Sequence, residues 1–272
     1  MEKNKLEKFL SLPVSIIIAA LILAAAWLYN ERLGPVVYSQ KTNTALTGSQ
    51  QVIKKSDMEE KVLPTVGVEL PVSWDDLGKK LVSTGAIDGE RFKALYEQRE
   101  QFTEEYEKLL LGNSNGKLII TEDNAGYLLN LFWALGLSNG NPILNDTKEM
   151  KNPNYGGAAN FASTGGWTMA VGSAMDHYNR HIYFDLTLEQ QALVDKISRG
   201  IYRPCCNNST HFPDCNHGMA MLGFLELMAS QGVSEQDMWK AALAVNSYWF
   251  PDTYITIATY MKNKGVEWQD VN

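Results

Sequence analysis

Residues 121–137 read TEDNAGYLLNLFWALGL. Thr121 is followed by two acidic residues, which favour the first turn of a helix because they complement the helix dipole. Large apolar side chains then recur at intervals of three and four residues: Tyr127, Leu128, Leu131, Phe132 and Leu135. That spacing places them on one face of a helix, so the stretch predicts an α-helix.

Helix patterns continue outward from this stretch in both directions. Towards the N-terminus, Ser73 can cap a short helix, and residues 88–111 hold many helix formers before Gly112. Towards the C-terminus, Thr187 and Gln190 form a capping-box pattern. Three more helices are predicted at residues 216–231, 234–250 and 252–264. Alternating strand patterns are scarce, so the fold class is mainly α: a multi-helix globular domain over residues 71–272.

One segment departs from this pattern because it is rich in glycine. Residues 151–173 contain Gly156, Gly157, Gly165, Gly166 and Gly172. Each glycine inside a helix costs roughly 1 kcal/mol, which disfavours regular structure here. Aromatic residues in the same segment disfavour disorder. We expect a long ordered loop in which the backbone approaches another part of the protein, or a well-packed irregular connection.

The N-terminal region predicts a membrane anchor. Residues 9–30 carry no charged side chain, and a helix needs about 20 apolar residues to cross a bilayer. Lys3, Lys5 and Lys8 precede this run, so residues 1–8 are expected in the cytoplasm and the main domain outside it. A cleaved signal peptide is the alternative, but the run is longer than the usual ~7–15-residue apolar region. Under either interpretation the domain is exported. With an uncleaved anchor, the protein is a single-pass membrane protein.

Residues 31–70 are expected to form a tether between the anchor and the domain. Polar stretches without period fill much of this region, and Pro64 and Pro71 mark its end. An extended piece of it would pack on the domain.

The charge balance limits the partners. Lysine and arginine number 24 against 31 acidic residues, a formal net charge of −7. An acidic surface repels phosphate backbones, so no nucleic-acid partner is expected. The expected contacts are the membrane, through the N-terminal helix, and an envelope protein or a small-molecule ligand that the sequence does not identify.

Chemistry-bearing residues gather in one segment. All four histidines and all three cysteines lie within residues 177–217, and residues 205–218 read CCNNSTHFPDCNHG. Thiolate and imidazole are the donors that zinc, iron and copper prefer. Cys205, Cys206, Cys215 and His217 therefore predict a metal site, with zinc expected first and iron or copper next. Cys215 and His217 would lie at a helix N-terminus, where the dipole stabilises thiolate.

Two alternatives remain open for the cysteines. A disulfide would persist in an exported domain and would staple the loop of a structural or interaction module, but three cysteines leave one unpaired. A thiol–disulfide redox protein would use Cys205, Cys206 and Cys215, although no Cys-x-x-Cys motif is present. The reaction, if the protein is an enzyme, is not indicated by the sequence.

The other histidines are weaker candidates. His177 and His181 are four residues apart and would share a helix face as additional ligands, without the glutamate of a metalloprotease helix. His211 would be a ligand or an acid–base group. Asp176 and Asp214 adjoin His177 and Cys215 and would orient ligands from a second layer.

Overall fold

The computed structural model of the chain describes residues 55–271, which are mainly helical. The α-helices are α3 (Asp57–Val62), α4 (Leu77–Ser83), α5 (Gly89–Glu97), α6 (Glu104–Leu111), α7 (Ala125–Ser138), α8 (Ala162–Gly165), α9 (Ala174–His177), α10 (Leu188–Gly200), α11 (Asn216–Ser230), α12 (Glu235–Trp249) and α13 (Pro251–Asn263). Four 3-10 turns lie between or after them: η1 (Pro142–Asn145), η2 (Pro153–Tyr155), η3 (Ala158–Asn160) and η4 (Trp268–Asp270). The strands are β1 (Val68–Ser73) and β2 (Lys117–Ile120), which pair antiparallel.

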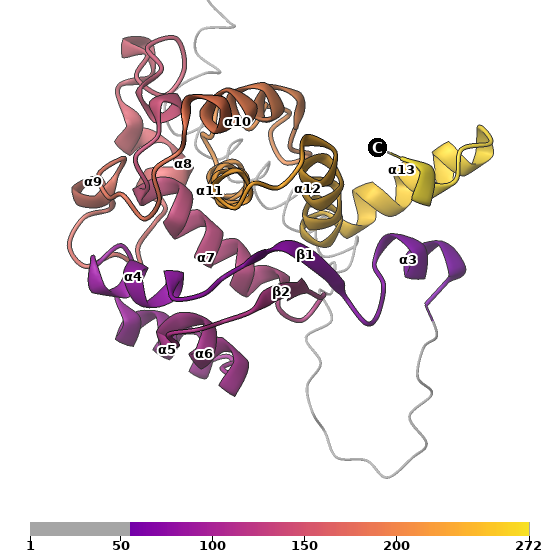
Figure 1. Ribbon diagram of the computed structural model, residues 1–272, viewed down its shortest axis with the longest axis horizontal. Coiled ribbons are helices and arrows are strands. Elements are labelled where there is room, and N and C mark those ends of the chain that lie inside the picture. The colour runs from indigo at the N-terminus through magenta and orange to yellow at the C-terminus, as the bar shows by residue number, and fades with distance from the viewer. Residues whose placement is uncertain (1–54, 272) are drawn as a thin grey trace, which may run out of the picture. The chain divides into compact units, whose positions relative to one another are not determined.

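Two helices, α7 and α11, form the centre of the domain. Nearly every residue of both helices is buried, and Figure 1 shows α11 end-on, with α7, α10 and α12 around it. A side chain at Gly136 would overlap the carbonyl oxygen of Met219, and a Cβ on Gly223 would lie 2.5 Å from the carbonyl oxygen of Phe132. The two backbones therefore approach closely because each helix has a glycine at the crossing.

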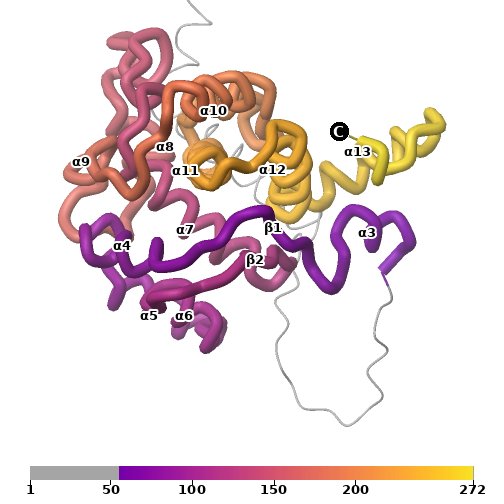
Figure 2. The backbone as a smooth tube through the Cα atoms, in the orientation of Figure 1, coloured from indigo at the N-terminus to yellow at the C-terminus, as the bar shows by residue number. Residues whose placement is uncertain are grey.

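The remaining elements cover this pair. The tube in Figure 2 follows α4, α5 and α6 together with the strand pair on one side, and α10 and α12 on another. Trp74, at the end of β1, is fully buried and packs edge-on against Phe132 of α7. Its indole N–H donates to the carbonyl of Leu109, 2.7 Å away, which fixes α6 beside the strand.

Several predicted helices are present with small changes in their ends. Thr187 and Gln190 form the predicted capping box of α10, and Ser234 caps α12. The predicted 88–111 helix is instead two helices, α5 and α6, separated by a turn in which Glu100 has a φ of 55°. The strand pair was not predicted, because β1 is short and contains Pro71.

The domain begins earlier than residue 71. Residues 55–70, which the sequence assigned to the tether, contain α3 and the first half of β1. Leu63 and Leu70 are buried in the core, and Ser56 with Glu59 forms a capping box at α3. These residues therefore belong to the domain, and their pattern was missed because α3 is too short to show a helical period.

The predicted anchor or signal sequence at residues 9–30, the basic end 1–8 and the tether up to residue 54 lie outside the described residues. Within residues 55–271, no helix has both the length and the hydropathy required to cross a bilayer.

The glycine-rich segment 151–173 forms an irregular connection of two 3-10 turns and α8. Trp167 is buried, and its indole N–H donates to the carbonyl of Ala86 at 2.9 Å. Tyr155 and Phe161 pack against Phe212, with ring centroids 5.5 Å and 5.4 Å from its ring. The segment is thus held against the loop that carries the cysteines.

Candidate metal centre

The first two cysteines lie at the tip of a tight loop between α10 and α11. Tyr202 and Ser209 form an isolated antiparallel bridge at the base of this loop. At the tip, the carbonyl oxygen of Arg203 accepts hydrogen bonds from the backbone N–H groups of Cys206 and Asn207, at 3.3 Å and 2.8 Å. Asn207 has a φ of 57°, a conformation that asparagine tolerates better than most residues. We call residues 203–215 the cysteine loop.

The third cysteine begins α11. Cys215 is the N-cap residue, with an extended backbone, and its sulfur accepts the backbone N–H of Gly218 at 3.4 Å. The helix N-terminus is the positive end of the dipole, which favours a thiolate at this position. The predicted start of this helix at residue 216 is therefore present.

The three sulfur atoms form a nearly equilateral triangle. The sulfur–sulfur distances are 3.6 Å between Cys205 and Cys215, 3.8 Å between Cys206 and Cys215, and 3.8 Å between Cys205 and Cys206. All three cysteines are free thiols, and these separations exceed the ~2.05 Å of a disulfide bond. A tetrahedral zinc site with Zn–S bonds of about 2.3 Å requires sulfurs about 3.8 Å apart. The triangle therefore has the size of one face of such a tetrahedron.

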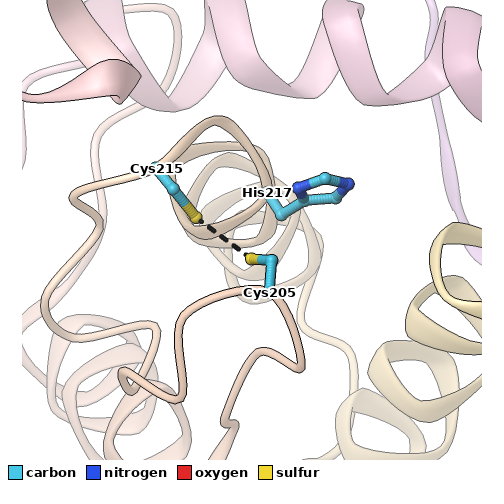
Figure 3. Close-up of side chains that lie close together, drawn as sticks. All are labelled: Cys205, Cys215 and His217. Atoms are coloured by element: carbon cyan, nitrogen blue, oxygen red, sulfur yellow. Dashed lines mark hydrogen bonds between the residues drawn. The ribbon is translucent and has the colours of Figure 1, made fainter. Parts of the chain in front are cut away.

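His217 lies beside the triangle. One of its ring nitrogens is within 4.8 Å of the sulfurs of both Cys205 and Cys215, and Figure 3 shows those two sulfurs facing one another with the imidazole alongside. The ring packs against Phe250, and its Nδ1 is buried without a hydrogen-bond partner in the described part of the chain. Burial, with the nearby charge of Arg203, lowers the pKa of His217 to about 4. The imidazole is therefore neutral at pH 7, as a metal ligand must be.

A second fourth-ligand candidate is Asp214. The sulfurs of Cys206 and Cys215 and one carboxylate oxygen of Asp214 also lie within 4.8 Å of one another. This carboxylate already accepts hydrogen bonds from Arg203 at 2.5 Å and Asn208 at 2.8 Å. Asp214 therefore fits its predicted role of orienting a ligand, because its carboxylate is already hydrogen-bonded. His217 fits the role of the ligand itself, because its Nδ1 has no hydrogen-bond partner in the described residues.

Arg203 is a site residue that sequence reasoning missed. Its side chain is fully buried, and it donates to the sulfur of Cys206 at 3.3 Å and to the carbonyl oxygens of Ser209 and Phe212 at 2.6 Å and 3.0 Å. Space for its guanidinium exists because residue 218 is a glycine: a Cβ there would lie 2.6 Å from Cζ of Arg203. Its position two residues before the cysteine pair was the available clue in the sequence.

The three cysteines have different pKa values, because they are buried to different extents and have different hydrogen-bond partners. Burial, together with the adjacent Cys215 and Cys206, raises the pKa of Cys205 to about 12. Burial also raises the pKa of Cys215. The pKa of Cys206 is lowered, since hydrogen bonds from the Asn208 backbone and from Arg203 outweigh the effect of its burial. Without a cation, the site therefore favours one thiolate at Cys206.

His177 and His181 do not join this group. Nδ1 of His177 lies 3.0 Å from Nε2 of His181, and Nε2 of His177 lies 2.8 Å from the carbonyl oxygen of Val171. Helix α9 ends at His177, so the expected shared helix face is absent. Asp176 completes the capping box of α9 with Ser173 rather than supporting a ligand.

His211 lies in a different cluster from the cysteines, although it belongs to the cysteine loop. It is buried, and its ring nitrogens contact Glu149 and Asp195. Its role is therefore separate from that of His217.

No protein-family model matches the chain, and no curated protein or solved structure is significantly similar to it.

Proposed function

We propose that this protein binds one zinc ion through Cys205, Cys206, Cys215 and His217, and that the ion fastens the cysteine loop to the start of α11. The observation that carries the proposal is the sulfur triangle, whose edges of 3.6–3.8 Å match a zinc tetrahedron. Four protein ligands would fill the coordination sphere, so the ion would be structural.

The donor set supports zinc ahead of the other soft ions. Three thiolates and one neutral imidazole form the Cys₃His set of structural zinc sites. Copper(I) and iron also accept thiolates and follow zinc in this proposal. The geometry favours zinc because a four-coordinate tetrahedron accounts for both the sulfur spacing and the uncommitted nitrogen of His217.

Electrostatics explain why a cation is needed. Without a cation, Cys205 and Cys215 keep their protons, because burial raises the pKa values of both. A divalent cation would replace these protons, and affinity would fall as pH decreases. Arg203 would offset part of the remaining negative charge from its buried position behind Cys206.

The location of the domain is the second part of the proposal. The charge-free run at residues 9–30, preceded by three lysines, supports an N-terminal anchor that holds the domain outside the cytoplasm. A structural metal would suit such a domain, which would present its acidic surface to an envelope protein or a small-molecule ligand. Labelling an engineered surface cysteine with a membrane-impermeant reagent in intact cells would test this; absence of labelling until lysis would reject it.

A thiol–disulfide exchange protein is the second candidate, favoured by the acidity of Cys206. Its thiolate would attack a disulfide of a partner, releasing one partner thiolate and forming a mixed disulfide. Cys205 or Cys215, 3.8 Å away, would then displace the second partner thiolate and leave an internal disulfide.

One experiment separates these functions. The full chain is purified in detergent without chelator, and its metal content and thiols under denaturing conditions are measured. One zinc and three thiols per chain support the zinc site, whereas no metal and one thiol support a disulfide. No metal, with thiols that cycle under a mild dithiol reductant, supports exchange.

A pair of histidine variants tests the fourth ligand. His217→Asn should weaken zinc binding by more than tenfold, measured by competition with a chromogenic chelator, since a first-layer ligand should matter at least as much as the 10–100-fold typical of outer partners. His181→Asn is the matched control and should leave zinc affinity unchanged. Equal affinities for both variants would remove His217 from the site.

A further inference from the structure

A second group of ligand-type side chains includes one residue of the cysteine loop, His211. Asp146 and Glu149 follow η1, and His211 comes from the loop itself. One carboxylate oxygen from each acid and one imidazole nitrogen lie within 4.8 Å of one another. Nδ1 of His211 faces Oε2 of Glu149 at 2.5 Å. This group shares no residue with the cysteine site.

On the opposite side of the His211 ring, Asp195 and Arg199 hold the imidazole in place. Nε2 lies 3.0 Å from Oδ1 of Asp195, and Arg199 holds both oxygens of that carboxylate at 3.0 Å. A carboxylate that accepts the second N–H of an imidazole fixes the tautomer in which the first nitrogen is free to bind a metal. Arg199 also lies 2.7 Å from Nε2, so the three side chains form one fixed unit.

The same atoms would suit a simple ion-pair network if the proton sat on Nδ1 of His211. Glu149 would then accept that proton, and Nε2 would accept from Arg199. In both arrangements three carboxylates face one guanidinium, which leaves two negative charges beside a neutral imidazole, and a divalent cation would offset this charge. In the described residues, no group donates to Oε1 of Glu149 or Oδ2 of Asp146. These oxygens remain available to a cation.

A cavity opens beside this group. Its volume is about 500 Å³, and Asp146, Asp195, Arg199 and His211 line it together with the apolar side chains of Ile143 and Leu188. A metal held by three protein ligands next to such a cavity would keep open coordination positions, as catalytic and ligand-binding sites do. The cysteine triangle, by contrast, would be closed by four protein ligands.

We propose that Asp146, Glu149 and His211 bind a divalent first-row transition ion whose open positions face this cavity. Two carboxylates and one imidazole combine the hard donors that suit manganese with the borderline donor that suits iron and zinc. Asp195 and Arg199 are positioning residues that orient His211. The ligand of the open positions would be a small oxygen-donor molecule, because the cavity offers room and a guanidinium beside the ion.

The two sites are linked through the cysteine loop. Arg203 donates to Cys206 and Asp214 at the cysteine site, and it also donates to the carbonyls of Ser209 and Phe212, which flank His211 along the chain. The aromatic contacts of Phe212 with Tyr155 and Phe161 hold the same loop from outside. Fastening the cysteine loop would therefore also place His211.

The test uses the full chain in detergent, loaded with one equivalent of zinc and titrated with Mn²⁺. Free Mn²⁺ is followed by electron paramagnetic resonance. We expect one Mn²⁺ site per chain, weakened at least about tenfold by Glu149→Gln and about 10–100-fold by Asp195→Asn. Glu189→Gln, which alters an exposed carboxylate of α10, is the matched control and should bind as the unaltered chain does.

The outcomes are distinguishable from those of the cysteine site. Circular dichroism establishes that each variant is folded, and an Asp146→Asn variant replaces any variant that is not. Absence of Mn²⁺ binding, or binding that Glu149→Gln and Asp146→Asn leave unchanged, would overturn the second site. The titration is repeated on chain freed of zinc, because zinc that the cysteine triangle does not take would compete with Mn²⁺ for the second site. Absence of Mn²⁺ binding in both titrations overturns the second site whether or not the triangle holds zinc.

Discussion

The start of α11 and its middle both bury an ionisable side chain, but they treat it differently. At the start, Arg203 is 1% exposed and donates to Asp214, Cys206 and two carbonyl oxygens. In the middle, Glu226 is 0% exposed, and Oε2 accepts from Asn139 at 3.0 Å. Its Oε1 has no hydrogen-bond partner in the described part of the chain.

The difference shows two ways of keeping a polar group in a core. Carboxylate, thiol and carbonyl groups surround the guanidinium of Arg203, whose hydrogen bond and charge lower the pKa of Cys206. Burial raises the pKa of Glu226 to about 8, so Glu226 is protonated at pH 7. The start of the helix therefore packs against charged side chains, whereas its middle buries a carboxyl group in the neutral form.

Removing the proposed metal ligand at the helix start, Cys215, should have the largest effect. Cys215→Ser keeps an N-cap residue that helices prefer, so it removes a sulfur while preserving the hydrogen bond to Gly218. We expect loss of zinc and a decrease of roughly 5 kcal/mol or more in the free energy of unfolding, because zinc binding contributes directly to folding. Denaturant unfolding with and without chelator measures both quantities.

The chelated proteins provide the control for this variant. Without zinc, Cys215→Ser and the unaltered chain should unfold at nearly the same denaturant concentration. A difference that persists in chelator would show that Cys215 stabilises the domain through packing, and the comparison between the two parts of α11 would lose its ionic basis.

At the middle of α11, the prediction concerns the pH dependence of stability, which Glu226 should control. The folded chain holds a proton on Glu226 up to about pH 8, whereas the unfolded chain releases it near the usual glutamate pKa of 4.5. Stability from this group is complete below pH 4.5 and is lost as pH rises towards 8. Glu226→Gln should remove a decline of up to roughly 5 kcal/mol across that range, read from unfolding at several pH values.

Glu90→Gln, an exposed glutamate of α5, serves as the control for general charge effects. Its stability should follow the pH dependence of the unaltered chain. If Glu226→Gln also follows it, Glu226 does not hold a proton in the folded state.

The sequence predicted most helices, because their caps and apolar periods are local. The capping box at Thr187 and the apolar face of residues 121–137 each lie within a few turns of chain. The strand pair was missed, since β1 and β2 are far apart in sequence and each is short. The division of residues 88–111 into two helices was also missed, because a non-glycine residue, Glu100, makes the turn.

The candidate site was predicted in part for a similar reason. Clustering of Cys205, Cys206 and Cys215 in the sequence was sufficient to predict that their sulfurs meet. His211 and His217 are only six residues apart, yet they face different clusters, because the loop turns between them before α11 begins. Arg203 was missed because burial of a guanidinium depends on tertiary contacts and on the space left by Gly218.

Removing the buried guanidinium of Arg203 should cost less than removing the proposed metal. Arg203→Met keeps a long side chain but leaves Asp214 without its main partner, and it removes one of the two donors to each of the carbonyls of Ser209 and Phe212. We expect a loss of about 3 kcal/mol in unfolding free energy, since breaking a buried pair is strongly destabilising. In zinc-free protein, the first thiol should also ionise at higher pH, followed by thiolate absorbance in the ultraviolet.

Arg180→Met gives the matched comparison, because Arg180 is exposed and makes one long hydrogen bond of 3.4 Å to the carbonyl of Asp176. Its effect should stay within about 0.5 kcal/mol. Equal effects of the two substitutions would mean that the buried position of Arg203 contributes no more than a surface charge.

The smallest effect should come from filling the space that Arg203 uses. Gly218→Ala places a methyl group 2.6 Å from Cζ of Arg203 and 2.9 Å from its Nε, so the guanidinium must move away from Cys206. Overpacking costs about 1–3 kcal/mol, and alanine returns about 1 kcal/mol of helix propensity. The net loss should be about 1 kcal/mol, with a higher pH for the first thiol ionisation than in the unaltered chain.

Gly126→Ala in α7, where a Cβ meets no atom within 4 Å, should instead stabilise the protein slightly. A Gly218→Ala variant that gains stability to the same extent would show that the guanidinium has room to move, and that its fixed position is not what distinguishes the start of α11 from its middle.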